Sequence, residues 1–212
     1  MKKNIIIFDL DGVLSDSTDH VLQFFLNIYP TLTKDMVDEM LTGNFPSEVE
    51  KLKLTHKRIT ETEEQRKKRN EEYSNKKAGL PLHQGIKELL KALHNKSYTL
   101  VVNTSASERN CLPVLRQAGI LDYFDVIATK ELSVSKTEKF KLIADRYGLQ
   151  PNQMIFITDT LGDIREADVA NVPTVAVTWG AHGRSFFERE KHENLVKIVA
   201  TVPELKSYLL SH

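Results

Sequence analysis

Short apolar runs rich in β-branched residues recur along the chain, and stretches with helical periodicity lie between them. Runs that are short and apolar throughout are typical of parallel strands buried on both faces by helices. The pattern predicts strands at 5–8, 98–103, 126–128, 154–158 and 174–177, with helices at about 84–94, 109–118, 137–147 and 164–169. This alternation predicts an α/β fold, a doubly wound (Rossmann-like) parallel sheet.

One long segment, from about Ser17 to Leu80, has helical periodicity and no strand pattern. Its first part carries apolar residues at the spacing of a buried helix face, whereas the stretch from Glu48 to Lys77 is roughly half charged. Such a charge run is typical of solvated helix surfaces. We therefore predict an inserted α-helical cap domain over residues 17–80 and a core domain formed by residues 1–16 and 81–212.

Composition narrows the range of partners. The 212 residues include 29 Lys plus Arg and 29 Asp plus Glu, so the net charge is zero, which argues against a nucleic-acid partner. No apolar stretch approaches the roughly 18 residues of a membrane span, and the first apolar run is too short for an export signal. The one cysteine, Cys111, is expected to pack in a helix and suits a reducing compartment. A cytoplasmic monomer or homodimer without a membrane partner is expected.

Polar residues follow the strand ends, where ligands bind in open α/β sheets. The residues in these positions are Asp9 and Asp11 after the first strand, Thr104 and Ser105 after the second, Lys136 at the helix that follows the third, and Asp159 and Asp163 after the fourth. We expect them to converge on one site. Taken alone, each aspartate is explained more simply as a turn or helix-cap residue. That explanation does not account for the whole set of residues at four strand ends.

This set of residues predicts phosphoryl chemistry. Clustered carboxylates repel one another unless a cation offsets them, and all-oxygen ligands favour Mg²⁺ over zinc. Magnesium commonly recruits a substrate phosphate, whose remaining oxygens the hydroxyls and Lys136 would bind. Asp9 is then expected to attack phosphorus as a nucleophile, and Asp11 to act as general acid and base.

The order and spacing of these residues resemble the four motifs of the haloacid dehalogenase-like (HAD) hydrolase superfamily. The matching segments are Asp9-Leu10-Asp11-Gly12-Val13, the Thr104 strand end, Lys136 in Ser135-Lys136-Thr137-Glu138-Lys139-Phe140, and Asp159 with Asp163 after an apolar strand. The insertion point resembles that of helical-cap (subclass I) members such as phosphoglycolate phosphatase and β-phosphoglucomutase.

The resemblance implies a role for each residue. Asp9 would be the nucleophile and, with the backbone carbonyl of Asp11, a magnesium ligand. Asp159 would bind the metal, with Asp163 supporting it directly or indirectly. Thr104 would bind the phosphoryl group and Lys136 would neutralise its charge, although the adjacent Ser105 is also a candidate for the side-chain contact. The chain departs from its relatives at Thr158, where glycine is common, and at Thr137, where proline is common.

The function expected from this resemblance is a Mg²⁺-dependent phosphatase that acts on a small phosphorylated metabolite through an aspartyl-phosphate. Three alternatives stay open: a phosphomutase of the β-phosphoglucomutase type, a phosphonate hydrolase that uses a cap lysine such as Lys51 or Lys53, and a catalytically idle regulatory protein. A dehalogenase is disfavoured because Asp11 has no role in displacing halide from carbon. The sequence does not identify the substrate.

Overall fold

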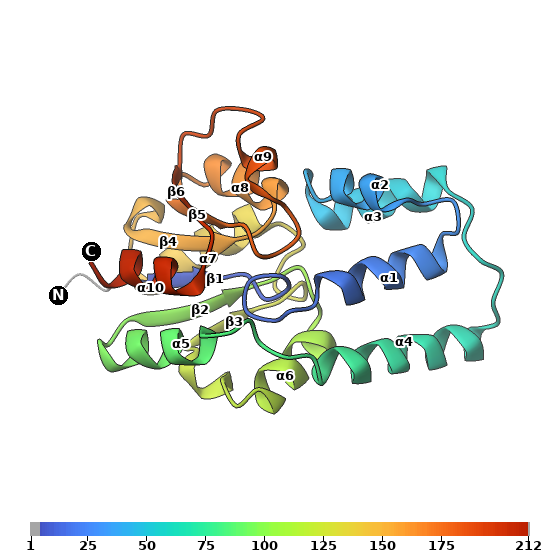
Figure 1. Ribbon diagram of the computed structural model, residues 1–212, viewed down its shortest axis with the longest axis horizontal. Helices are drawn as coiled ribbons and strands as arrows, with labels where there is room; N and C mark the ends of the chain where they lie inside the picture. The colour runs from blue at the N-terminus through green and yellow to red at the C-terminus, as the bar shows by residue number, and fades with distance from the viewer. Residues whose placement is uncertain (1–4, 212) are drawn as a thin grey trace.

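The computed structural model describes residues 5–211, which form a parallel sheet covered by helices on both faces and flanked by a helical cap (Figure 1). The sheet has the strand order β3-β2-β1-β4-β5-β6, and every neighbouring pair is parallel. The strands are β1 (Ile5–Phe8), β2 (Thr99–Asn103), β3 (Val126–Ala128), β4 (Met154–Thr158), β5 (Thr174–Val177) and β6 (Leu195–Val199). The predicted doubly wound α/β fold is therefore confirmed.

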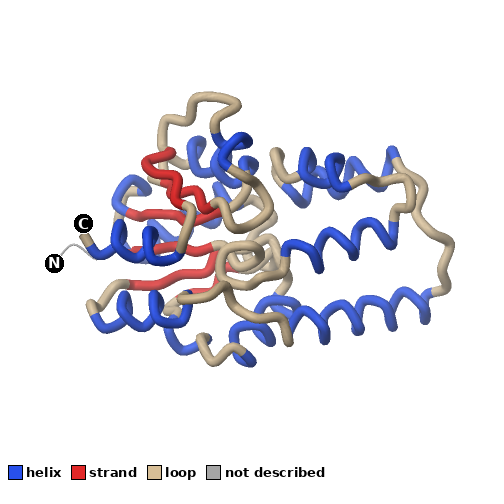
Figure 2. The backbone as a smooth tube through the Cα atoms, viewed as in Figure 1, coloured by secondary structure: helices blue, strands red, loops and turns tan. Residues whose placement is uncertain are grey.

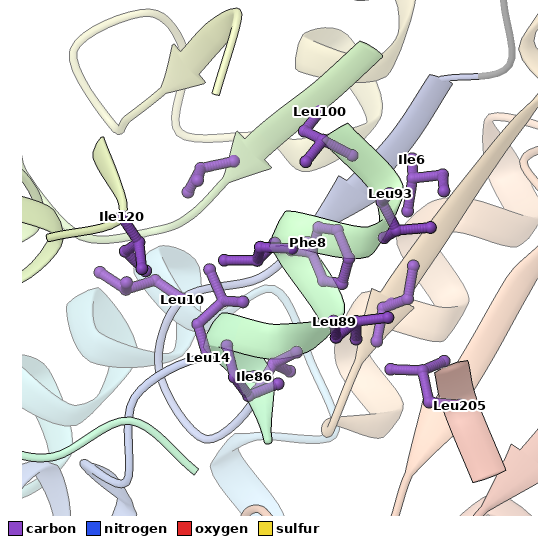
Figure 3. Close-up of a cluster of buried hydrophobic side chains, with 14 of the residues drawn as sticks. Ile6, Phe8, Leu10, Leu14, Ile86, Leu89, Leu93, Leu100, Ile120 and Leu205 are labelled. Carbon is purple, nitrogen blue, oxygen red and sulfur yellow. The ribbon is translucent and has the colours of Figure 1, made fainter. Parts of the chain in front are cut away.

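The sheet separates two apolar cores. Because successive side chains of a strand point to opposite faces, Ile6 and Phe8 enter one core cluster whereas Ile5 and Ile7 enter another. Figure 3 shows the first cluster, in which Phe8 lies against the helix that follows the cap. Each fully buried aliphatic or aromatic side chain of this kind contributes roughly 1.5–3 kcal/mol to folding. Burial on both faces explains why the strands are apolar throughout.

Helices from different parts of the chain cover the two faces. The first cluster is covered by α5 (Ile86–Asn95), α6 (Glu108–Gln117) and α10 (Val202–Leu210), and it also contains the buried Cys111. The second cluster is covered by α7 (Lys136–Tyr147) and α8 (Leu161–Val169), while the short α9 (Arg184–Phe187) packs beside α8. Two 3-10 turns, Leu121–Tyr123 and Pro151–Gln153, precede β3 and β4.

Three elements near the carboxyl end were not predicted. The short α9, the strand β6 and the helix α10 extend the fold beyond β5, the last strand that the pattern predicts. β6 is the sheet edge, and Val196 and Lys197 in its middle are exposed. An edge strand of this kind lacks the continuous apolar run by which the central strands were recognised.

Four helices form the cap, which lies beyond the carboxyl ends of the strands (Figures 1 and 2). They are α1 (Thr18–Ile28), α2 (Lys34–Met40), α3 (Phe45–Thr55) and α4 (Glu63–Ala78). The cap has its own apolar cluster around Leu22, Phe25 and Val37. In the part of the chain that the structure describes, no helix has the length and apolar character needed to cross a membrane.

The charged stretch of the cap is exposed for most of its length, as its composition indicates. The exception among its charged side chains is Lys77, which is buried in the last turn of α4. Its interpretation as part of a solvated surface was therefore wrong. The reason is a single ion pair with Asp11, described below.

The cap touches the core at a close backbone contact. The amide of Gly162, in the first turn of α8, donates to the carbonyl of Leu41 at 2.9 Å. A Cβ atom at position 162 would lie 2.1 Å from the carbonyl oxygen of Gly43. Arg165 and His182 add hydrogen bonds to carbonyls of the same cap segment, at 2.6 and 2.9 Å. Only glycine at position 162 allows this approach.

Gly162→Ala should therefore displace the cap from the core. The added methyl group meets backbone, which has no flexible end that can move aside, so the segment after α2 must shift. We expect faster proteolytic cleavage of residues 41–44, with the melting temperature of the core nearly unchanged. Gly183→Ala is the matched control, because nothing lies within 4 Å of its added Cβ. Equal cleavage rates in the two variants would contradict the assignment.

Candidate active site

The site residues are held in place by the sheet itself. Hydrogen bonding continues one residue past the strands, since the amide of Asp9 donates to the carbonyl of Ile157 at 2.9 Å and that of Thr104 to Ala128 at 3.0 Å. β1 pairs with β2 on one side and with β4 on the other, so the strand order reverses at β1. A crevice at such a reversal of strand order is the usual ligand site of open α/β folds.

Lys136 links two of the carboxylates. Its ammonium lies 3.1 Å from Asp9 Oδ1 and 2.6 Å from Asp163 Oδ2, with its side chain 2% exposed. Burial disfavours the charged amine, but the two carboxylates outweigh that penalty and raise the pKa of Lys136. Thr158 also donates to Asp163 Oδ2, at 2.6 Å. Asp163 is thus held by two donors.

Asp9 is fixed at one oxygen and open at the other. Oδ1 accepts from the amide of Leu10 at 2.8 Å and contacts Lys136, whereas no hydrogen bond or ion pair of the described residues involves Oδ2. Burial raises the pKa of Asp9 to about 7, against the opposing effect of Lys136. A carboxylate held this way is oriented for reaction at its open oxygen.

Asp159 lacks a partner that its charge requires. The side chain is 1% exposed, and Oδ2 accepts from the amide of Ala181 at 2.7 Å, but Oδ1 has no partner among the described residues. Burial, followed by the nearby Asp9, raises the pKa of Asp159 well above its usual value. Gly12 and Gly180 enclose the carboxylate so closely that a Cβ on either would lie within 2.2 Å of Oδ2.

The donors fit a magnesium ion. A buried carboxylate oxygen without a partner, on an aspartate whose pKa is further raised by the nearby Asp9, is the kind of group that a hard divalent cation stabilises. Within residues 5–211, no group of three or more Asp, Glu, His or Cys side chains is arranged to hold a metal ion, so a metal here would need other ligands in addition. Asp163 is already bound by Lys136 and Thr158, so the side chains best placed for the metal are Asp9 and Asp159.

Thr104 and Ser105 both line the cavity, and they differ in burial. Thr104 is 1% exposed and its Oγ1 accepts from the amide of Ala106 at 3.1 Å, while Ser105 is partly exposed. The carbonyl of Thr104 accepts from the buried ammonium of Lys139 at 2.7 Å. Burial, assisted by Lys136, lowers the pKa of Lys139 to about 8. Lys139 was not among the predicted site residues, although it lies one helical turn after Lys136 on α7.

Asp11 has a donor at each oxygen. Ser17 Oγ donates to Oδ1 at 2.6 Å, and Lys77 Nζ donates to Oδ2 at 2.7 Å. Burial disfavours the Lys77 ammonium, but the Asp11 carboxylate more than offsets it and raises the pKa of Lys77. Lys77 was also missed from the sequence, where its partner is 66 residues away.

All seven predicted site residues line a cavity of about 630 Å³ between the core and the cap. The cap contributes apolar and aromatic side chains to this cavity, among them Phe24, Phe45 and Tyr73. Of the two cap lysines considered for a Schiff base, Lys53 lines the cavity and Lys51 does not. The cavity has the size and mixed lining of a small-molecule site.

Comparisons with known proteins place the chain in a family. The family model for haloacid dehalogenase-like hydrolases matches residues 6–177. The chain belongs to this family, which confirms the resemblance and the expectation of an enzyme of the hydrolase class. The residues matched include all four strand-end motifs.

Individual relatives carry several names. A phosphoglycolate phosphatase of Nitrosospira multiformis is 32% identical over 108 residues, which span 49% of this chain and 48% of that protein. The chain thus spans about half the length of that relative. The tyrosine-protein kinase PtkA of Mycobacterium tuberculosis is 27% identical over 210 residues, 97% of this chain and 72% of its own. The crystal structure of a predicted phosphoglycolate phosphatase from Haemophilus somnus has a TM-score of 0.71 at 24% identity, with 98% and 99% coverage, which supports the fold.

The pKa of Asp9 predicts how stability varies with pH in metal-free protein. Asp9 holds a proton up to about pH 7 when folded but only to about pH 4 when unfolded, so the folded state binds more protons between these values. The free energy of unfolding should therefore fall as pH rises from about 4 to about 7, and fall less in Asp9→Asn. Urea titrations in EDTA at several pH values measure this difference. The exposed Glu193→Gln is the control, and identical slopes in wild type and Asp9→Asn would refute the assignment.

Proposed function

We propose that the protein is a Mg²⁺-dependent phosphatase that hydrolyses a small phosphorylated metabolite through an aspartyl-phosphate. The observation that carries this proposal is Asp9, held at one oxygen by Lys136 and Leu10 and open at the other, together with the nearby buried Asp159, one oxygen of which has no partner among the described residues. Membership of the hydrolase family and relatives named as phosphatases support it.

The reaction would proceed in two displacements. Asp9 attacks phosphorus, the bond from phosphorus to the ester oxygen breaks, and Asp11 gives its proton to the departing alkoxide. A water molecule then attacks the aspartyl-phosphate while Asp11 takes its proton, and phosphate leaves with Asp9 restored. Lys136 and the hydroxyl and amide groups at Thr104 and Ser105 would bind the phosphoryl oxygens.

A magnesium ion, held by Asp9, Asp159 and the Asp11 carbonyl with support from Asp163, would supply positive charge against the phosphoryl oxygens. The protein side chains carry the proton transfers and the covalent step. The buried setting of Asp159 makes it a strong ligand once its charge is offset, because few other groups compete for that oxygen.

The cavity bears on the substrate. A volume of about 630 Å³ holds a leaving group larger than a two-carbon acid, so phosphoglycolate, named for relatives, is one candidate among larger phosphate esters. The cap covers the site and would exclude bulk water during turnover. Another relative is named a tyrosine-protein kinase, so assays should also test a tyrosine hydroxyl as the acceptor of the phosphoryl group.

The alternative functions have less support. A phosphonate hydrolase would need a neutral cap lysine beside the substrate, but Lys51 and Lys53 are 68% and 51% exposed and pair with Glu48 and Glu50. A phosphomutase shares the same first step and differs in the fate of the aspartyl-phosphate, so release of phosphate against isomer formation separates the two. A catalytically idle regulatory protein would not need a reactive side chain at every motif position, yet this chain has one at each.

Asp9→Asn should abolish hydrolysis of an aryl phosphate such as p-nitrophenyl phosphate. The amide is a poor nucleophile, so no aspartyl-phosphate forms. EDTA should abolish the activity of the wild type, and added Mg²⁺ should restore it. Phosphate release in a screen of phosphorylated metabolites measures both effects, with Glu193→Gln as the matched carboxylate control. Full turnover in Asp9→Asn would show that the nucleophile lies elsewhere.

Asp11→Asn separates proton transfer from metal binding. The metal would contact only the backbone carbonyl of residue 11, so Mg²⁺ should raise the melting temperature of this variant by as much as it raises that of the wild type, which is also expected to rise. Its turnover should fall by roughly a hundred- to ten-thousandfold, the usual contribution of general acid–base catalysis. Loss of the Mg²⁺-dependent shift in melting temperature would argue that the carboxylate itself binds the metal.

A further inference from the structure

Lys77 is the one charged side chain of the cap that is buried, among residues 17–80, all of which the structure describes. It lies in the last turn of α4, just before the chain returns to the core, and its side chain is 2% exposed. Its ammonium is 2.7 Å from Asp11 Oδ2, and no other ion pair of the described residues includes it. The adjacent Lys76 is exposed.

Stability does not explain a buried ammonium at this place. Moving a charge out of water costs several kcal/mol, and replacing a buried ion pair by apolar residues of similar volume is often neutral or stabilising. Besides Asp11, the titratable groups that act on Lys77 are Tyr73 and the buried Cys111, and neither is a second counter-ion for the ammonium. The ion pair therefore calls for an explanation in what it does to Asp11.

We infer that Lys77 positions the carboxyl group of Asp11 for proton transfer to the leaving group and from water. This inference rests on the proposed acid–base role of Asp11. General acid–base catalysis requires the donor atom to be held within hydrogen-bond reach of the reacting oxygen. With Lys77 on one oxygen and Ser17 on the other, the Asp11 carboxylate cannot rotate without breaking a short hydrogen bond.

The position of Lys77 is itself fixed relative to the core. Ser74, one turn earlier on α4, donates to Asn110 Oδ1 on α6 at 2.6 Å. Just after α4, the carbonyl of Pro81 accepts from the amide of Asp16 at 2.9 Å. The end of α4 is thus tied to the core on both sides of Lys77, so the cap delivers the ammonium to a defined point beside Asp11.

Lys77 also lines the cavity, so direct contact with the substrate is the competing explanation. The two explanations differ in kinetics. If Lys77 binds the substrate directly, removing it should raise KM, or should lower kcat by the same factor whether or not Asp11 is present. If Lys77 acts through Asp11, removing it should have no effect on kcat in the Asp11→Asn variant.

A double-mutant cycle tests the inference with a phosphate ester of an unactivated alcohol as substrate. Lys77→Met keeps an unbranched stem of four heavy atoms and removes the terminal ammonium, so kcat should fall about ten- to a hundredfold while KM changes by less than about threefold. In the Asp11→Asn background, Lys77→Met should cause no further loss. Lys76→Met is the matched control and should keep wild-type kcat.

Several outcomes would overturn the inference. These are an equal loss from Lys77→Met in both backgrounds, a rise in KM with kcat unchanged, or wild-type kcat in Lys77→Met. If Asp11→Asn itself keeps full turnover, the acid–base assignment fails as well. If Asp11→Asn is slow but Lys77→Met is not, only the role of Lys77 fails.

A second measurement does not depend on turnover. Asp11→Asn leaves the buried ammonium without its counter-ion, so its melting temperature should be below that of the wild type, and adding Lys77→Met should restore part of the loss. Additive effects on the melting temperature would refute the coupling. If Lys77→Met does not fold, Lys77→Arg enters the same kinetic cycle, since its planar guanidinium places the donors differently. Its kcat should fall only where Asp11 is present, and an equal fall in both backgrounds would overturn the inference.

Discussion

A single buried ammonium makes the arrangement of carboxylates possible. Lys136 lies between Asp9 and Asp163, at 3.1 and 2.6 Å, where the two negative charges would otherwise repel each other in a poorly solvated crevice. Removing one partner of such a buried pair typically costs about 3–5 kcal/mol, because the remaining charge stays out of water. The parallel sheet brings the ends of β1 and β4 together, and α7 then supplies the cation from its first residue. The strand order that brings the carboxylates together is therefore tolerated only because Lys136 offsets their charge.

Close backbone approach is the second requirement of the site. Gly12, with a φ of +74°, turns the chain after β1 and leaves room for the Asp159 carboxylate, and Gly180 does the same from the other side. Gly162 allows the cap backbone to meet α8 in the same manner. The absence of side chains at these positions lets the acidic groups and the cap come within contact distance. Such contacts involve backbone, which cannot rearrange as a flexible side chain can.

The sequence predicted the core well where burial leaves a local pattern. Strands β1 to β5 are continuous apolar runs, and residues directly after them converge because parallel strands share one carboxyl edge. β6 was missed because its central residues, such as Lys197, face solvent at the sheet edge. Lys77 was misread for a different reason: composition describes its neighbours in sequence, whereas its burial depends on Asp11, 66 residues earlier. Contacts of that range leave no periodic signal.

The two departures from the family pattern become intelligible through their hydrogen bonds. Thr158, where glycine is common, donates to Asp163 Oδ2 and so gives that carboxylate a second donor beside Lys136. Thr137, where proline is common, donates to the carbonyl of Glu166 at 3.0 Å, and the carboxylate of Glu166 accepts from the amide of Lys136 at 2.8 Å. Each such bond contributes about 0.5–1.5 kcal/mol. The Thr137 bond fixes α7 against α8, whereas the Thr158 bond, which comes from the end of β4, fixes the Asp163 carboxylate beside the ammonium of Lys136. In this chain, hydroxyl groups orient the ion pair at positions where glycine or proline offers no side-chain donor.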